Sequence, residues 1–480
     1  MKENLIRNWK VVFFFSLYLA VLLICKAPDI TAKCFGNDSY SLLYGAKYME
    51  IRYPSPLFTF LGYPFANLPF GNSGGNLTLF LSTIPAFTSS IMVFLVLKKK
   101  TVDELAPWIG TATLMGSCIF FSQAIIIEVY SLLAMFLSIS YCLLVYDKPK
   151  MAVVFAGFAL CVHLVVAIPF YIAMVVSYDK FRKYCYVPII VYFAIVYCYY
   201  NFVPDFYWDA GADSSLWGVL TQSIDSLGIG SGIDQIFGSL WMTVKILIIG
   251  FGLSIVPIFL AIRNRNIGVV APLIFVIGIA VSFMVVGDWP YRYVKLAPYS
   301  PFVAILAGLG VVYIRTKYLK QIILGSSILM MISMPMFFDI GRTIDENPTA
   351  ASRMYSSLND VENGSIIVCL AMFDTGEEWV SDTLAGHFSG IVEQHNREEN
   401  RDLIPFVLDI VWNSESQNKQ PLLENGINIP SFDELCQQVT EEDTYMYIME
   451  EVVKANLERD VYWYKMVDRK TERCDLTKVN

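Results

Sequence analysis

Residues 107–146 read PWIGTATLMGSCIFFSQAIIIEVYSLLAMFLSISYCLLVY, and Glu128 is the only charged side chain in this stretch. A helix that crosses a bilayer needs about 20 predominantly apolar residues. The stretch therefore predicts two consecutive spans with one acid between them. Extended along the chain, the same criterion predicts about ten spans, over 9–25, 77–97, 107–127, 131–146, 151–177, 185–203, 240–262, 268–287, 300–314 and 321–338.

The composition agrees with a membrane protein. Apolar residues make up 55% of the 480 residues and charged residues 16%, whereas soluble domains average about 25% charged residues. The mean hydropathy is +0.51. Soluble single-domain enzymes, disordered chains, collagens and nucleic-acid binders with basic faces are therefore disfavoured.

Charge divides the chain in two. Residues 341–480 hold 27 acids and 12 bases, a net charge of −15, while residues 1–340 hold 16 acids and 23 bases, a net charge of +7. We therefore expect an α-helical polytopic membrane body over 1–340 and an acidic soluble α/β domain over 341–480, joined by a linker at 341–351. In this domain 364–373, 402–411 and 444–449 have strand patterns, and 375–397 and 450–458 look helical.

The basic residues predict the orientation, because Lys and Arg concentrate on the cytoplasmic side of short loops. Placing every basic cluster inside puts loop 26–76 and the tail 341–480 outside. The run 151–177 is either one long helix or two short ones that meet near His163. The predicted orientation requires a short re-entrant pair here, which returns to the side of the membrane that it left. The clusters are Lys2/Arg7/Lys10, Lys98–Lys100, Lys148/Lys150, Lys180/Arg182/Lys183, Arg263/Arg265 and Arg315/Lys317/Lys320.

Familiar catalytic and metal signatures are missing from the sequence. No Cys-x-x-Cys pair, P-loop, GxGxxG or His/Glu zinc pattern occurs. Six cysteines fall in apolar runs. A disulfide is conceivable among the four that lie outside them, Cys34, Cys369, Cys436 and Cys474.

Two acids on the predicted outer side are candidate catalytic groups. Asp38 follows the first span, where neighbouring helices can partly desolvate a carboxylate that stays ionised; the alternative is that it caps a helix over 39–50, since Asp is a favoured N-cap. Glu128 lies between two spans, and acids in the apolar zone are candidates for function. The alternative for Glu128 is a solvated turn residue.

The stretch Gly287–Lys295 carries two bases on the outer face, which is otherwise poor in them. Arg292 is suited to bidentate phosphate contacts, and Lys295 could assist. Tyr291 and the neighbouring aromatics could stack on a sugar or form an interfacial belt. His163, the only histidine of the membrane body, is either a hydrogen-bonded core residue or a ligand.

These residues, taken in order, resemble the protein O-mannosyltransferase-like membrane proteins of the GT-C superfamily of glycosyltransferases. The resemblance rests on Asp38-Ser39, Pro56-Leu57-Phe58-Thr59-Phe60-Leu61-Gly62, Leu68-Pro69-Phe70-Gly71, Glu128-Val129-Tyr130-Ser131-Leu132, Gly157 to Pro169 with His163-Leu164, and Arg292-Tyr293 followed by Pro298 and Ala307-Gly308-Leu309-Gly310. The chain departs from the family where Tyr40-Ser41 replaces Gly-Glu, so one motif acid is missing. It departs again where Ile51-Arg52-Tyr53-Pro54-Ser55 replaces His-Pro-Pro-Gly-Tyr.

The resemblance implies a GT-C-like body of 10–11 spans and an inverting transferase. Such an enzyme would move one sugar, mannose or a similar hexose, from a polyprenyl-phosphate carrier to a protein or glycan acceptor outside the cytoplasm, at a cell or ER-type membrane. Asp38 would be the general base, Arg292 with Lys295 would bind the phosphate, and His163 and Tyr291 would contact the substrate. Glu128 would orient hydroxyls or help to hold Mg²⁺ or Mn²⁺, although the chemistry does not require a metal.

Two other classes of protein remain open from the sequence. A transporter or flippase would need charges near the midplane and paired broken helices in two related halves. A membrane scaffold would use the acidic tail as its active part.

Overall fold

The computed structural model describes residues 2–26, 38–50, 55–203, 248–264, 294–337, 355–371, 388–409, 446–453, 459–466 and 476–478. The chain forms two compact units, one helical and one that holds a β-sheet, with a boundary between Gly341 and Arg342. The first part of helix α2, up to Tyr44, groups with the second unit. The predicted span 268–287, most of 240–262 and the linker 341–351 lie outside the described residues.

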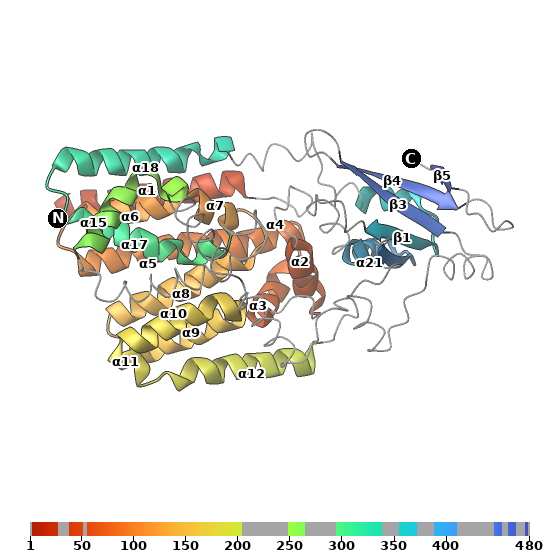
Figure 1. Cartoon of the computed structure of the whole chain (residues 1–480), viewed down its shortest axis with the longest axis horizontal. Helices are drawn as coiled ribbons and strands as arrows, with labels where there is room; N and C mark the ends of the chain where they lie inside the picture. The colour runs from red at the N-terminus through yellow and green to blue at the C-terminus, as the bar shows by residue number, and fades with distance from the viewer. Residues whose placement is uncertain are drawn as a thin grey trace, which may run out of the picture. The chain divides into compact units, whose positions relative to one another are not determined.

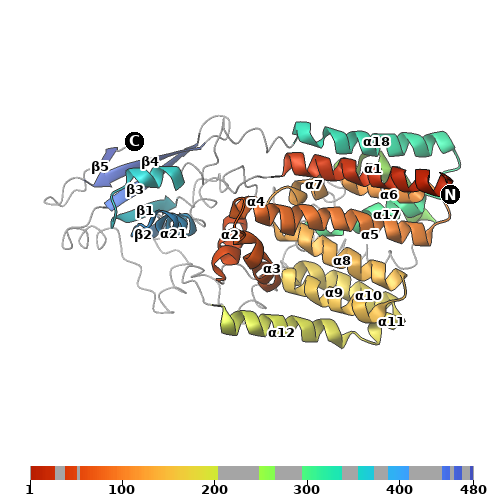
Figure 2. The same ribbon diagram turned by 180° about the vertical axis from the view of Figure 1, so that it is seen from behind.

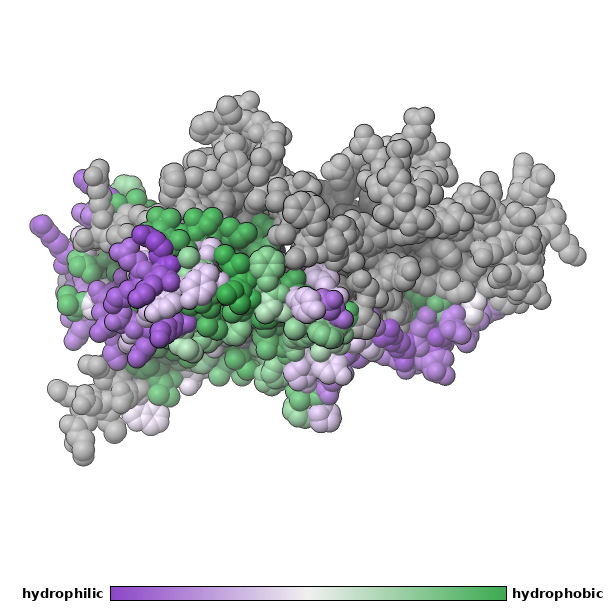
Figure 3. All heavy atoms as spheres, turned by 90° about the horizontal axis from the view of Figure 1, so that it is seen from below, coloured by the Kyte–Doolittle hydropathy of each residue, from purple (hydrophilic) through white to green (hydrophobic). Residues whose placement is uncertain are grey.

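Apolar helices make up the helical unit (Figure 1). Among the described residues, Ser73–Lys100 and Lys317–Met336 are long and apolar enough to cross a membrane, and the bent pair α7–α8 could form a third span. Hydrophobic side chains cover a broad area of its surface (Figure 3). The elements are α1 (Lys2–Cys25), α2 (Asp38–Tyr48), α3 (Pro56–Ala66), α4 (Ser73–Leu77), the π-helical η1 (Thr78–Thr83), α5 (Ile84–Lys100), α6 (Ala106–Met115), α7 (Cys118–Ala124), α8 (Val129–Val145), α9 (Pro149–Val162), α10 (Leu164–Ser177), α11 (Asp179–Arg182), α12 (Tyr186–Phe202), η2 (Gly252–Ser254), α15 (Ile255–Arg263), η3 (Val294–Tyr299), α17 (Ser300–Val311) and α18 (Lys317–Phe337).

One predicted span is broken. The run 107–127 was expected to be a single helix, but it divides into α6 and α7 at Gly116 and Ser117, so that prediction is wrong. Gly116 approaches α18 closely, since a Cβ added there would lie 2.6 Å from the Ser327 carbonyl oxygen. The contact between backbones therefore requires a residue without a side chain at the break.

The run 151–177 forms two short helices, α9 and α10, that meet at His163. The residues on either side of the pair lie together, because Lys180 Nζ is 2.5 Å from Asp147 Oδ1. The prediction that the pair returns to the end it left is therefore confirmed. The Lys180 ammonium, through its hydrogen bond and then its charge, holds the pKa of the exposed Asp147 carboxyl below its usual value.

The helix ends that carry the basic clusters lie at one end of the helical unit (Figures 1 and 2). The starts of α1, α9 and α18 and the ends of α5 and α15 all meet there. Lys98–Lys100, Lys148, Lys150 and Lys180 are exposed at this basic end. The opposite end holds the starts of α8 and α10 and the segment η3.

Small residues let helices approach in the interior of the unit. A Cβ added at Gly310 of α17 would lie 1.8 Å from the Pro257 carbonyl oxygen of α15. Buried hydroxyls also join helices, with Thr113 Oγ1 2.7 Å from Ser254 Oγ and Ser254 Oγ 3.2 Å from Ser327 Oγ. Both devices are typical of packing between apolar helices, where burial of apolar surface gives no driving force in lipid.

The second unit contains a five-stranded sheet in the order β2-β1-β3-β4-β5. Strand β1 pairs in parallel with β2 and β3, and the other pairs are antiparallel. The Asn396 side chain closes the turn from α21 into β2, because its Nδ2 donates to Leu403 O at 2.7 Å and its Oδ1 accepts from Leu403 N at 3.0 Å. The elements are η4 (Leu358–Asp360), β1 (Ile366–Ala371), α21 (Phe388–Glu399), β2 (Ile404–Asp409), β3 (Met446–Val453), β4 (Arg459–Met466) and β5 (Leu476–Lys478).

The three predicted strand runs are confirmed, and α21 forms the end of the predicted helix 375–397. The helix predicted over 450–458 is wrong where it is described, because residues 450–453 continue β3 and pair with β4 as far as Val453 opposite Arg459. The β-branched Val452 and Val453 favour a strand. Residues 375–387 and 454–458 lie outside the described part of the chain.

Candidate active site

Glu128 lies at a sharp break between α7 and α8. The two helices are bent by 112°, and Glu128 has extended backbone angles, φ −153° and ψ 153°, at the N-cap position of α8. Its side chain makes no capping hydrogen bond, and the residue is only 5% exposed. The alternative that Glu128 is a solvated turn residue is therefore wrong. A buried carboxylate at a helix break remains a candidate for function.

Hydroxyl groups satisfy the backbone at this break. Ser131 Oγ donates to the Gln123 carbonyl oxygen at 2.8 Å, and Thr83 Oγ1 donates to the Ala124 carbonyl oxygen at 2.9 Å. These carbonyls belong to the last turn of α7, where no amide of the same helix can reach them. In an apolar environment every such group needs a partner. The two hydroxyls therefore stabilise the break.

The Thr83 hydroxyl comes from the π-helical segment η1, which runs without interruption into α5. A π-turn adds one residue per turn, and such turns occur frequently at functional sites. The same segment supplies Ser82, whose Oγ lies 3.4 Å from the Glu128 carbonyl oxygen. Two consecutive residues of η1 thus contact the two sides of the break.

A second break, at His163, lies beside the first. His163 is partly exposed, ends α9, and accepts the Val166 amide at 3.5 Å through Nδ1 at the start of α10. Its ring stacks on Tyr130 of α8, with centroids 5.8 Å apart. Ser55 Oγ donates to the Val162 carbonyl oxygen at 2.6 Å. His163 therefore lies next to the helix that begins after Glu128, which is compatible with both interpretations of its role.

The segment η3 is the third irregular element at this end. It packs against both α7 and α8, and the Tyr299 hydroxyl at its end donates to the Val166 carbonyl oxygen of α10. Lys295 lies in η3, and its side chain is outside the described atoms. Arg292 and Tyr291 precede η3 and lie outside the described residues. Their predicted roles stay predictions.

Asp38 is the first residue of α2. The helix expected over 39–50 is present as Asp38–Tyr48, one residue earlier at its start and two earlier at its end. The Asp38 side chain is outside the described atoms. Both predictions for Asp38, helix cap and general base, therefore stay open.

Sequence reasoning assigned no role to the hydroxyls of Thr83 and Ser131 or to the ring of Tyr130. No local pattern marks Thr83, because its hydroxyl pairs with a carbonyl more than forty residues further along the chain.

The metal prediction finds no support among the described side chains, where no three His, Cys, Asp or Glu residues lie close enough to hold an ion. The metal therefore stays a prediction.

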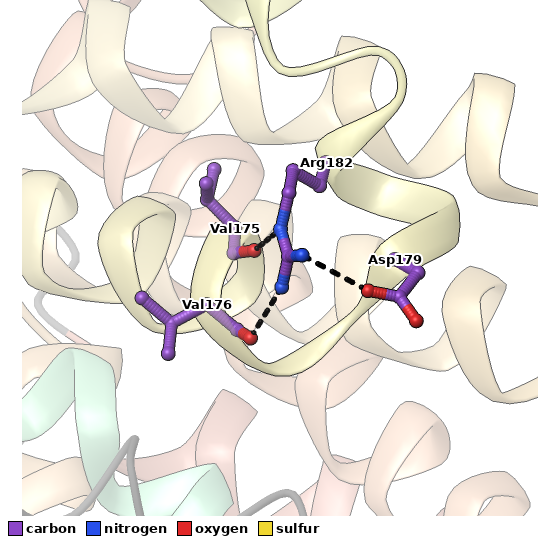
Figure 4. Close-up of polar contacts among 4 residues, drawn as sticks. All are labelled: Val175, Val176, Asp179 and Arg182. Carbon is purple, nitrogen blue, oxygen red and sulfur yellow. Dashed lines mark hydrogen bonds and ion pairs between the residues drawn. The ribbon is translucent and has the colours of Figure 1, made fainter.

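At the basic end Arg182 has a structural role. Its Nε and Nη2 donate to the carbonyl oxygens of Val175 and Val176 at 2.9 and 2.8 Å, and Nη1 lies 3.1 Å from Asp179 Oδ1 (Figure 4). Arg182 thus caps the last turn of α10, where a cation also complements the helix dipole.

Comparison with known proteins identifies the fold. No protein-family model and no curated protein matches the sequence. The crystal structure of ArnT from Cupriavidus metallidurans in the apo state is similar with a TM-score of 0.57 and 12% identity, covering 95% of this chain and 98% of that chain. The same protein bound to undecaprenyl phosphate has a TM-score of 0.59 and 11% identity, with the same coverage. The archaeal oligosaccharyltransferase AglB from Archaeoglobus fulgidus, in complex with an inhibitory peptide and a dolichol-phosphate, has a TM-score of 0.47 and 11% identity, covering 92% of this chain and 70% of that chain.

At these identities the ArnT comparison establishes architecture, and the likeness extends over nearly the whole of both chains. The predicted O-mannosyltransferase-like family is not matched and stays a prediction. The chain has the fold of ArnT.

Proposed function

We propose that the protein is a membrane glycosyltransferase that takes one sugar from a polyprenyl-phosphate carrier. The observation that carries this proposal is the buried Glu128 at a helix break within a GT-C fold. A buried acid in an apolar helical unit is costly and is kept for function. One protein of this fold has been crystallised with undecaprenyl phosphate, a carrier of the proposed kind.

In the proposed reaction an acceptor hydroxyl attacks the anomeric carbon of the sugar. The hydroxyl proton passes to the Asp38 carboxylate, the new bond forms between oxygen and carbon, and the bond from carbon to the carrier phosphate breaks. The electron pair leaves with the phosphate, and the configuration at carbon inverts. A general base is useful because a neutral hydroxyl is a poor nucleophile.

The remaining residues act on charge and orientation. Arg292, with Lys295, would stabilise the phosphate as its charge develops, because fixed cations lower the energy of such a transition state. Glu128 would accept hydrogen bonds from sugar or acceptor hydroxyls. His163 and Tyr291 would contact the donor, with the His163 ring held against Tyr130.

The sidedness of the reaction follows from charge. The basic clusters gather at one end of the helical unit and Glu128 lies at the other, so the positive-inside rule predicts that Glu128 faces the non-cytoplasmic side. We propose that loop 26–76 and the sheet unit face the same side, and that a protein or glycan acceptor approaches from there. The sugar is proposed to be mannose or a similar hexose.

The test is sugar transfer from a polyprenyl-phosphate hexose by the purified protein and two near-isosteric variants. Asp38→Asn retains capping ability, since Asn caps a helix about as well as Asp, but it removes the base. We expect a loss of roughly 10²–10⁴ in turnover with an unchanged melting temperature. Glu128→Gln should lower turnover as well. Transfer at the wild-type rate by a folded Asp38→Asn protein would show that Asp38 is only a cap.

Arg292 is tested by binding of the donor. Arg292→Ala should weaken donor binding or turnover strongly, and Arg292→Lys should restore it only in part, because lysine lacks the planar fork of guanidinium. Equal donor affinity in the wild type and in Arg292→Ala would remove Arg292 from the site.

A lipid-carrier flippase is the second candidate, because the two helix breaks resemble the discontinuous helices of transporters. Both breaks lie within residues 118–164, whereas such a transporter carries broken helices in two related halves of the chain. Movement of a labelled carrier across proteoliposomes, without chemical transfer to any acceptor, would favour this alternative.

A further inference from the structure

The position of Glu128 depends on how the break between α7 and α8 is held. Only three residues connect the helices before Glu128, and all three, Ile125, Ile126 and Ile127, are buried. The direction of the Glu128 side chain is therefore set by the end of α7, by the start of α8 and by the packing of these isoleucines.

Two hydroxyls hold the ends together. Ser131 lies in the first turn of α8, and its bond to the Gln123 carbonyl reaches back across the break. Thr83 joins the next carbonyl, that of Ala124, to the helix that contains η1. Both residues are fully buried, so water does not replace either hydroxyl when it is removed.

We propose that Thr83 and Ser131 are positioning residues that fix Glu128 for sugar transfer, an inference that rests on the proposed function. Without a hydroxyl, the freed carbonyl of α7 must find another donor, because an unpaired backbone group is costly in an apolar interior. In a continued α-helix the Gln123 carbonyl would accept from the amide four residues further on, that of Ile127, so α7 would extend into the connection. Such an extension advances the chain by about 1.5 Å for each added residue and rotates it.

A displacement of this size matters more for catalysis than for folding. A misplacement of about 1 Å can cost about 10²-fold in rate. We therefore expect Thr83→Val and Ser131→Ala to lower kcat roughly 10–100-fold, the range found for residues that orient functional groups. KM should change by less than about threefold, because neither side chain is proposed to contact substrate.

Matched controls separate positioning from stability. Ser140 lies on α8, is buried, and donates to the Ala152 carbonyl of α9 at 2.8 Å, so Ser140→Ala removes the same kind of bond away from the break. Thr78 lies in η1 and donates to the Gly74 carbonyl of its own helix at 3.0 Å, which makes Thr78→Val the control for Thr83→Val. Both controls should keep wild-type kcat at a melting temperature close to that of the test variants.

Two further variants show whether the effect acts through Glu128. Thr83→Ser retains the hydroxyl and should recover most of the lost kcat. Ser131→Ala in a Glu128→Gln background should lower kcat little further, because residues that act as one unit are not additive.

The assay is sugar transfer from a polyprenyl-phosphate hexose by the full-length protein, with melting temperatures measured on the same preparations. If the wild type transfers no sugar, the proposed function fails and this inference fails with it. If the wild type transfers sugar but Thr83→Val and Ser131→Ala lose no more kcat than Thr78→Val and Ser140→Ala, only the positioning role is refuted.

Discussion

Replacing Gly310 by alanine should destabilise the helical unit, because α15 and α17 touch at this residue. The added Cβ would lie 1.8 Å from the Pro257 carbonyl oxygen and 2.5 Å from its carbonyl carbon. Real Cβ contacts begin at about 3.0 Å, so the two helices must separate locally by about 1.2 Å. A gap of 0.5–1 Å already forfeits roughly a quarter to a half of the dispersion energy of each affected contact.

The expected destabilisation can be estimated from measured effects of overpacking. Additional methylene groups in a packed interior cost about 1–3 kcal/mol, and more where only backbone can move. For a unit of this size we expect Gly310→Ala to lower the melting temperature by on the order of 2–10 °C. Gly325 of α18 is the matched control, because nothing lies within 4 Å of a Cβ added there. Gly325→Ala should raise the melting temperature slightly, since alanine exceeds glycine in helix stability by about 1 kcal/mol.

Thermal unfolding of both variants in the same detergent gives the answer. The expected result is opposite signs for two identical chemical changes. A Gly310→Ala protein as stable as the wild type would show that α15 and α17 do not approach at Pro257, and the packing described for this interface would be wrong.

The stability of the sheet unit should depend on pH through His395. This residue is buried, and its Nε2 lies 3.1 Å from Asn359 Oδ1. Burial and then the charge of Arg401 lower its pKa below 6.5, while Glu399 and Glu398 oppose this shift. The folded state prefers the neutral ring, so the melting temperature should be constant above about pH 6.5 and fall as the pH drops below it. His395→Gln should reduce this fall. Identical pH profiles for the variant and the wild type would contradict the assignment. Arg182→Lys should raise the rate of amide hydrogen exchange in the last turn of α10, because lysine cannot cap two carbonyls and pair with Asp179 at once. Lys183→Ala is the control. Equal exchange rates in both variants would show that the cap is dispensable.

The sequence predicted structure best where the polarity or charge of the residues changes within a few positions. The strands β1 and β2 were recognised as apolar runs of strand length between polar segments. The return of the pair α9–α10 to the end it left followed from basic residues on both sides of it. Glu128 was recognised because a single acid interrupts forty residues without another charge. These signals are local and need no knowledge of neighbouring helices.

The misses lie inside uniformly apolar runs. Hydropathy does not predict a helix break such as that at Gly116, because the residues on both sides are apolar whether the helix continues or not. At this break Gly116 lies against the backbone of α18, a contact between residues more than two hundred positions apart in sequence. The error at 450–453 has the same origin, since pairing with β4 decides that these residues form a strand.

The helix breaks also explain how an apolar helical unit can hold a polar site at a modest energetic cost. Each break frees carbonyl groups, and the hydroxyls of Thr83, Ser131 and Ser55 satisfy carbonyls at or beside the two breaks without introducing charge. Serine and threonine are small and apolar enough to remain in a helix, so the unit keeps its packing while its backbone changes direction. The buried charge at the first break is then carried by Glu128. We therefore expect the breaks to tolerate exchanges between Ser and Thr, which keep a hydroxyl, far better than exchanges to Ala or Val.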